Sequence, residues 1–122
     1  MPLTFLLDEH LRGVLWQAIQ NRNALGGPFT DVVCVGDPPD LPLGSADPDL
    51  LLWAERAGRI LITRDARTMP RHFRHHLQAG HHSPGLLLIV PSSSLQALVA
   101  ALELIAHAGD PANYLDQIDY IP

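Results

Sequence analysis

Acidic side chains stand at three places in the sequence where an apolar run or its loop gives way to a helical pattern. Asp8 and Glu9 directly follow the first apolar run, and Asp65 follows a later one. Between these two places, Asp47 and Asp49 lie in the first turn of a predicted helix. Carboxylates that converge repel one another unless a cation lies among them, and all-oxygen ligands suit Mg²⁺ or Mn²⁺. The pattern therefore predicts a divalent metal site, provided that the fold brings the three places together.

The apolar runs have the length and composition of buried strands, and each is continuous rather than alternating in polarity. They cover residues 3–7, 32–35, 59–63 and 86–90. Helical periodicity follows each run, at about 11–19, 47–57, 68–79 and 94–108. Continuous apolar strands that alternate with helices are typical of a parallel sheet covered on both faces. We therefore predict one three-layer α/β domain over residues 1–122, with a central, mostly parallel sheet of about four strands.

The residues after the predicted core of about 3–108 form a tail, 109–122, without a clear element pattern. Its apolar residues are scattered: Tyr114, Leu115, Ile118, Tyr120 and Ile121. They could cover an edge of the sheet or a partner, including a second copy in a homodimer, and the sequence does not decide between these.

The acids are expected to share one edge of the sheet. In open parallel sheets, ligands bind beyond the carboxyl ends of the strands, near the point where the strand order reverses. Asp8 and Asp65 follow strands directly, and Asp47 starts a helix that is reached from such an end. Structural roles are the alternative, since Asp47 or Asp65 could cap the helix that follows it. Asp8, placed after a buried strand and beside a second acid, has the least structural use.

All 8 basic residues are arginine, so the chain contains no lysine. This excludes a P-loop lysine, a Schiff-base lysine and the lysine of phospho-accepting receiver domains, although Asp8 and Asp65 occupy the strand ends used there. The net charge of -5 also argues against strong non-specific binding to nucleic acid.

The single cysteine, Cys34, lies in an apolar run and is expected to be a core residue. One cysteine forms neither a disulfide framework nor a thiolate metal site, which fits a reducing compartment. No apolar run approaches the roughly 18 residues of a membrane span. We therefore expect a soluble, cytoplasmic protein without a membrane partner.

Positive charge is concentrated in residues 56–74, where six of the arginines lie with a single acid. The spacing of Arg67, Arg71 and Arg74 predicts one helix face, and Arg64 directly precedes the acid at the strand end. A phosphate track beside a metal site is what RNA cleavage requires. A solvated helix, or a stripe that pairs with an acidic partner, is the alternative.

Histidines gather just after the arginines, and five of the 7 lie at positions 72, 75, 76, 81 and 82. The spacing of His72, His75 and His76 could bind zinc, but no Cys or acidic ligand lies nearby in the sequence. An exposed or RNA-contacting helix is the favoured interpretation. His10, beside the first acids, could orient a phosphate or cap the first helix.

Four segments together resemble a known family. They are Phe5-Leu6-Leu7-Asp8-Glu9-His10-Leu11, Ser45-Ala46-Asp47-Pro48-Asp49-Leu50-Leu51 with Trp53-Ala54, Gly58-Arg59-Ile60-Leu61-Ile62-Thr63-Arg64-Asp65, and Pro84-Gly85-Leu86-Leu87-Leu88-Ile89. In order and spacing they are similar to the small bacterial PIN-like proteins, long filed as a domain of unknown function. That family is related to the VapC-type toxin nucleases and to the RNase domain at the C-terminus of Mut7-like proteins. The resemblance covers about residues 3–90, and its motifs are moderately specific together.

The resemblance implies a PIN-like sheet and a Mg²⁺- or Mn²⁺-dependent endoribonuclease that cuts single-stranded RNA. It also implies a toxin role with a small antitoxin protein as partner. Matching the motifs places the catalytic acids and principal metal ligands at Asp8, Asp47 and Asp65. Glu9 and Asp49 are further metal ligands.

Substrate contacts are expected from the basic segment and from two residues beside the acids: Arg64, Arg67, Arg71, Arg74, Thr63 and His10. Thr63 matches the usual hydroxyl residue of the family, which could hydrogen-bond a carboxylate or a metal-bound water. Arg67 stands where many relatives carry a further acid. A PIN-like binding module that acts through a protein partner, with weak or no catalysis, is therefore the alternative.

Overall fold

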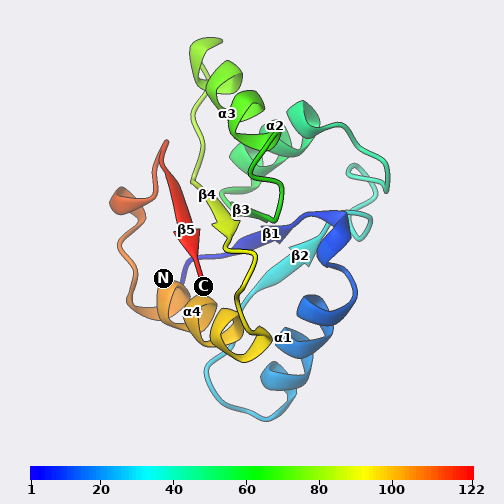
Figure 1. Ribbon diagram of the computed structural model, residues 1–122, viewed down its shortest axis with the longest axis vertical. Coiled ribbons are helices and arrows are strands. Elements are labelled where there is room, and N and C mark those ends of the chain that lie inside the picture. The colour runs from blue at the N-terminus through cyan, green and yellow to red at the C-terminus, as the bar shows by residue number, and fades with distance from the viewer.

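The structure is a computed structural model that describes all residues from Met1 to Pro122 (Figure 1). Five parallel strands form one sheet in the order β2-β1-β3-β4-β5. The strands are β1 (Phe5–Leu7), β2 (Val32–Cys34), β3 (Ile60–Thr63), β4 (Leu86–Ile89) and β5 (Ile118–Ile121). The predicted α/β class is confirmed, whereas the sheet has one strand more than the four expected.

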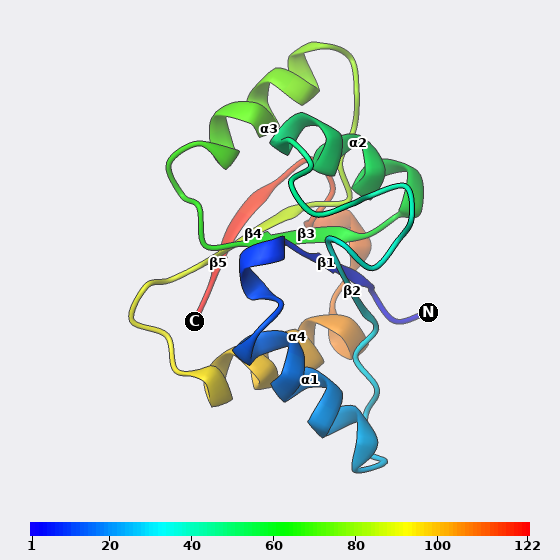
Figure 2. The ribbon, with the colours of Figure 1, turned by 90° about the vertical axis from the view of Figure 1, so that its right-hand side faces the viewer.

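Two pairs of helices cover the sheet, one pair on each face (Figure 2). Helices α1 (Val14–Ala24) and α4 (Leu95–Ala108) pack on one face. Helices α2 (Asp47–Ala57) and α3 (Met69–Gln78) pack on the other. Two short 3-10 helices, η1 (Glu9–Leu11) and η2 (Pro111–Asn113), complete the elements. This arrangement confirms the predicted three layers.

The central strands are buried on both faces, which explains their continuous apolar sequences. In β1, Phe5 and Leu7 pack in the core on the α1/α4 side, and Leu6 packs in the core on the α2/α3 side. All three side chains are fully buried. The strand ends are therefore fixed in position relative to both helix layers, and so are the residues that follow them.

The connection through α4 differs in hand from the other three. From β3 to β4 and from β4 to β5 the chain moves in the same direction across the sheet, yet α3 and α4 lie on opposite faces. Connections between parallel strands are right-handed in about 98% of cases, so a connection of the opposite hand to its neighbours is unusual. Packing supplies a reason, because Leu98 and Leu102 of α4 cover the face that α1 covers only in part.

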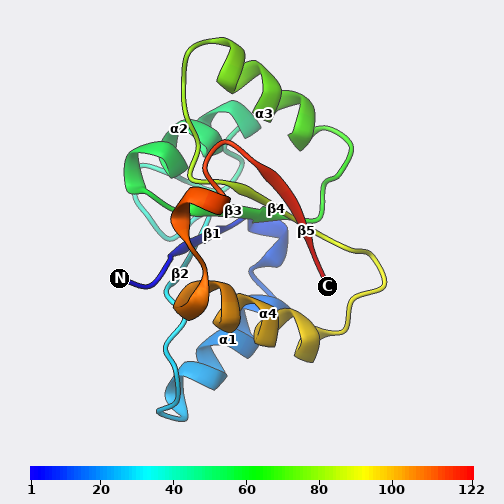
Figure 3. The same cartoon turned by 90° about the vertical axis from the view of Figure 1, so that its left-hand side faces the viewer.

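The tail provides the fifth strand, β5, which pairs with β4 in parallel at the border of the sheet (Figure 3). Its Ile121 is buried in the core, whereas Tyr120 points to solvent. Gly85, just before β4, has φ +140°, and a Cβ there would lie 2.9 Å from the carbonyl oxygen of Tyr114. The tail thus covers a sheet edge, one of the two roles that the sequence left open. None of the helices combines the length and apolarity needed to cross a membrane.

Candidate functional site

The order of the strands reverses between β1 and β3, because the chain leaves β1 toward β2 and leaves β3 toward β4 on the other side. The loops at the carboxyl ends of these two strands diverge to opposite faces, and such points bind ligands in open α/β sheets. Asp8 directly follows β1, and Asp65 lies two residues after β3. Both acids therefore stand at the predicted edge.

Asp8 is held rigidly at this edge, with only 8% of its surface exposed. Its Oδ1 accepts a hydrogen bond of 2.7 Å from the backbone N–H of His10, which caps η1. Its Oδ2 accepts a 2.6 Å bond from the hydroxyl of Thr63. Asp8 therefore has a structural role as well as a place at the candidate site.

Thr63 lies behind the acids rather than at the surface, since its side chain is fully buried. While its hydroxyl donates to Asp8, the same oxygen accepts a 3.1 Å bond from the backbone N–H of Asp65. The expected contact between Thr63 and substrate is thus corrected to a positioning role, in which one hydroxyl joins the two acids.

Asp65 is oriented by the turn that precedes α3. Its Oδ1 accepts bonds from the backbone N–H groups of Arg67, at 3.0 Å, and of Thr68, at 2.9 Å. The hydroxyl of Thr68 donates to its Oδ2. These bonds, first that of the Thr68 hydroxyl, hold the pKa of Asp65 below its ordinary value. The carboxylate is therefore ionised and fixed by the turn before α3. It does not cap the helix, the alternative that the sequence offered, because the N-cap is Thr68.

Asp47 is the first residue of α2 and is half-buried; its side chain caps nothing, since the N-cap is Ala46. Burial raises the pKa of Asp47 above its ordinary value, and the negative charges of Asp65 and Asp8 add to that rise. The nearby His72, whose Nε2 lies 3.8 Å from Oδ2, opposes it, as does His10. Asp47 is thus close enough to Asp65 and Asp8 for their charges to act on it.

The ligand atoms of Asp8, Asp47 and Asp65 do not all lie within 4.8 Å of one another. Only one set of three acidic, histidine or cysteine side chains in the chain has its ligand atoms within 4.8 Å of one another, and it lies elsewhere. Mg²⁺ commonly binds through one or two carboxylates and several waters. The donors at this edge are carboxylate oxygens, which is the ligand chemistry that Mg²⁺ and Mn²⁺ prefer. Asp8, Asp47 and Asp65 therefore offer the ligand chemistry of such an ion, whereas their ligand atoms are not gathered closely enough for all three to bind one ion directly.

The two further acids expected as ligands are directed elsewhere. Oε1 of Glu9 accepts a 2.8 Å bond from the backbone N–H of Gly44 and so anchors the loop before α2. Asp49 is exposed and lines a hollow of about 550 Å³ together with Trp53 and Arg56. That hollow contains none of the three converging acids.

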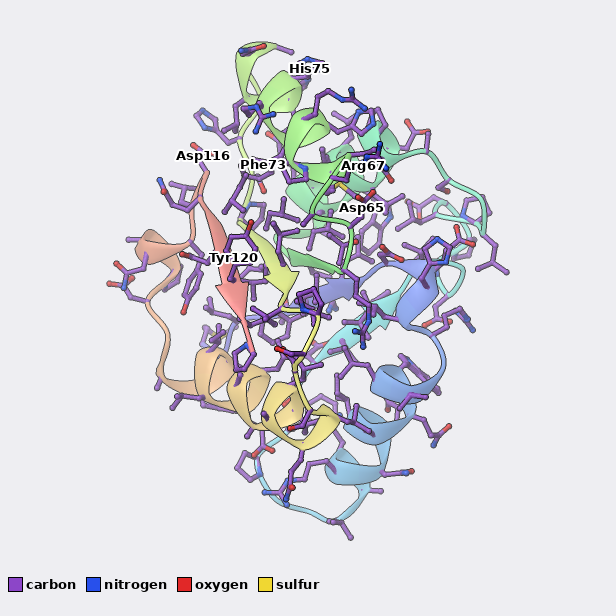
Figure 4. All side chains as sticks on the ribbon, viewed as in Figure 1. Asp65, Arg67, Phe73, His75, Asp116 and Tyr120 are labelled. Carbon is purple, nitrogen blue, oxygen red and sulfur yellow. The ribbon has the colours of Figure 1, made fainter.

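The arginines expected to contact RNA are exposed, and no carboxylate oxygen lies within 4.0 Å of their guanidinium groups. Arg71 and Arg74 lie on α3, whereas Arg64 and Arg67 lie in the turn before it. The prediction that Arg67 belongs to the helix is therefore wrong, since α3 begins only at Met69. Figure 4 shows Arg67 beside Asp65 on this turn. The arginines that do form ion pairs lie elsewhere: Arg12, Arg22 and Arg59.

Cys34 is a fully buried core residue, as predicted. Burial raises the pKa of its thiol to about 11, so the thiol stays protonated at neutral pH. Its Sγ lies 3.7 Å from the backbone oxygen of Asp8. Cys34 thus supports the end of β1 through packing.

Two side-chain contacts in the structure were not predicted from the sequence. Thr68 follows Asp65 by three residues, and that spacing of an acid and a hydroxyl residue before a helix could have signalled the contact. Glu55 of α2 meets His76 of α3 and His81 of the next loop. Nothing in the sequence signals this meeting, because the residues come from three different segments.

Comparison with known proteins identifies no relative. No family model matches the chain, no curated protein matches it, and no solved structure matches it. The PIN-like relationship therefore stays a prediction from the sequence motifs, and the function is argued from geometry.

Proposed function

We propose that this protein is a metal-dependent endoribonuclease that cuts single-stranded RNA at the carboxylate edge formed by Asp8, Asp47 and Asp65. One observation carries the proposal. The charges of Asp8 and Asp65 act on Asp47 where the strand order reverses, and no arginine side chain forms an ion pair with any of the three acids. A divalent cation relieves the repulsion among such groups.

The three acids have distinct tasks in this proposal. Asp8 and Asp65 are immobilised by hydrogen bonds, and both oxygens of Asp8 and Oδ2 of Asp65 accept only one bond each, which leaves lone-pair capacity for a metal ion or its water. Asp47 reaches the same edge from α2 and completes the negative charge. Bound Mg²⁺ or Mn²⁺ would lower the pKa of a bound water and stabilise charge on the leaving oxygen.

The unpaired arginines supply the surface for the RNA backbone. Arg64 and Arg67 lie beside Asp65, and Arg71 and Arg74 continue the positive charge along α3. Guanidinium groups without acidic partners are available to phosphates, which dominate the affinity for nucleic acid. The acids line none of the principal hollows.

The resemblance to PIN-like proteins adds a biological role, a toxin neutralised by a small antitoxin protein. Expression in a bacterial host tests this role. The wild type should arrest growth, whereas Asp8→Asn, expressed at the same level, should not. Equal growth of the two strains would remove the toxin role while leaving the nuclease proposal open to its own assay.

A second candidate is an RNA- or protein-binding module without catalysis. The observation that favours it is that Asp8 and Asp65 also organise η1 and the start of α3. In addition, the carboxylate of Glu9 accepts a hydrogen bond from the backbone N–H of Gly44. Arg67 stands where members of the PIN-like family carry an acid. Such a module would bind RNA through the arginines without cutting it.

Incubation of the protein with a mixed pool of single-stranded RNA in Mg²⁺ or Mn²⁺ separates these candidates. A nuclease should cut the pool in the wild type and in Asp119→Asn, a control whose exposed carboxylate bonds nothing. Cutting should be lost in Asp8→Asn and on chelation of the ion. Binding without cutting by the wild type would favour the module, and equal cutting by Asp8→Asn would rule out this site.

A further inference from the structure

A second cluster of metal-binding side chains lies at the opposite edge of the sheet, where the chain enters β4. Glu55 is near the end of α2, His76 is near the end of α3, and His81 is in the loop that leads to β4. Oε1 of Glu55 lies 3.0 Å from Nε2 of His76 and 3.4 Å from Nδ1 of His81. These are the only three such groups whose ligand atoms lie within 4.8 Å of one another.

We propose that Glu55, His76 and His81 bind a transition-metal ion, of which Zn²⁺ is the best match. Two imidazoles and one carboxylate are ligands that Zn²⁺ takes, and Mg²⁺ and Ca²⁺ disfavour the nitrogen donors. Ligand atoms about 2.0–2.1 Å from a tetrahedral ion lie roughly 3.3 Å apart. The two distances from Glu55 bracket this value. With three protein ligands, the fourth position is open to water.

The carboxylate of Glu55 is held so that one oxygen faces the histidines. Its other oxygen, Oε2, accepts a 3.1 Å bond from the backbone N–H of His82. The imidazole of His82 is itself engaged by Asp116, with Nδ1 2.8 Å from Oδ2. Asp116 also accepts a 2.7 Å bond from the backbone N–H of Ser83. Bonds that fix a ligand from behind are typical of metal sites.

Binding requires two adjustments within the cluster. Nε2 of His76 donates a 2.9 Å hydrogen bond to the backbone oxygen of His82, so the ion must displace this bond and binding requires the tautomer with hydrogen on Nδ1. The rings of His76 and His81 are stacked with an interplanar angle of 20°, so one ring must turn for both nitrogens to face one ion. The side chain of His81 is 46% exposed and has the freedom to turn, whereas that of His76 is only 4% exposed.

An ion in this place would join α2, α3 and the loop before β4. Because His82 and Asp116 connect the same loop to the segment before β5, the ion would also brace the tail strand. Asp116, labelled in Figure 4, lies at the start of that strand. The site is separate from the carboxylate edge and does not rest on the proposed nuclease function.

Calorimetric titration of the tag-free protein with Zn²⁺ tests the proposal, and Co²⁺ as a spectroscopic probe reports the geometry. The wild type should bind Zn²⁺ at one tight site, distinct from any weaker binding at the carboxylate edge, and show the visible bands of tetrahedral Co²⁺. His81→Ala and Glu55→Gln should weaken binding about 100-fold or more, since even residues behind the ligands change metal affinity by roughly 10–100-fold. His75→Ala, an exposed histidine of the same helix outside the cluster, should bind like the wild type.

The location of the site is tested by Zn²⁺ affinity in a variant of the other site and by the effect of Zn²⁺ on thermal unfolding. Asp8→Asn should keep full Zn²⁺ affinity, and Zn²⁺ should raise the thermal unfolding temperature of the wild type but not of His81→Ala. Unfolding of His81→Ala in a chelator serves as the check of folding, since this side chain is largely at the surface. The proposal is overturned if the wild type binds no Zn²⁺, if His81→Ala binds it equally, or if only Asp8→Asn loses it.

Discussion

The hydroxyl of Thr63 donates a 2.6 Å hydrogen bond to Oδ2 of Asp8 and thereby joins the ends of β3 and β1. Both side chains are buried, and the bond spans the point where the strand order reverses. A buried carboxylate without such partners is costly, because it loses its hydration. Thr63 therefore supplies a hydrogen bond to the buried Asp8 carboxyl and orients it at the edge of the sheet.

Replacing Thr63 tests this relationship. Thr63→Val keeps the shape of the side chain but removes the donor, so it should lower the free energy of unfolding by about 1–3 kcal/mol. It should also reduce metal-dependent cleavage, since Asp8 loses its orientation. Thr63→Ser, which retains the hydroxyl, should lose less of both. Chemical denaturation of the three proteins measures the first effect, and unchanged stability of Thr63→Val would contradict the role assigned to the bond.

The arginines of α3 should determine how RNA binding depends on salt. Arg71→Ala combined with Arg74→Ala should weaken RNA binding and lower the slope of log affinity against log salt by about 0.7 for each phosphate that is no longer neutralised. Arg22→Ala is the matched control, because Arg22 is paired with Glu103 on the other side of the sheet. Equal slopes for the double variant and the wild type would exclude a phosphate track on α3.

Cys34 should resist alkylation in the folded protein. Its thiol is fully buried, and burial raises its pKa to about 11, so at pH 8 very little thiolate exists and none of it is accessible. Labelling with iodoacetamide at pH 8, followed by mass spectrometry, should be slow in buffer and rapid in denaturant. Fast labelling of the native protein would show that β2 does not pack as described.

Gly85 should be required for the docking of the tail. A Cβ at this position would approach the carbonyl oxygen of Tyr114 to 2.9 Å, so Gly85→Ala should destabilise the fold by at least about 1–3 kcal/mol. Gly80→Ala is the control, because Gly80 also has positive φ but an added Cβ there meets nothing within 4 Å. Thermal unfolding compares them, and equal losses would mean that strain alone, without the contact to the tail, sets the cost.

The strands and the edge that carries the acids could be predicted from the sequence, because a strand that is buried on both faces has a continuous apolar sequence. Runs such as Phe5–Leu7 and Leu86–Ile89 are apolar throughout, since both faces of these strands are covered. The acids directly after such runs then mark the carboxyl edge. Strand β5 lacks a continuous apolar sequence, because Asp119 and Tyr120 are exposed at the border of the sheet.

The details of the site depend on tertiary contacts that the sequence does not encode locally. Glu9 is near the edge in sequence, but the loop before α2 brings Gly44 to its carboxylate. The zinc interpretation of the histidines lacked an acidic ligand because Glu55 lies in α2, which β3 separates from His76 in α3. In both cases the partner is supplied by a distant segment, so only the fold shows it.

Calorimetric titration with Mn²⁺ tests the central claim most directly, namely that Asp8, Asp47 and Asp65 form one site for a divalent ion. The titration is best made in a His81→Ala background, which removes the histidine cluster as a second destination for the ion. In that background the protein should bind Mn²⁺, and adding Asp8→Asn or Asp65→Asn should abolish the binding. If the parent binds no ion, or if both Asn variants bind it unchanged, the carboxylates at the β1/β3 edge are structural and the account of this protein as a metal-dependent nuclease is wrong.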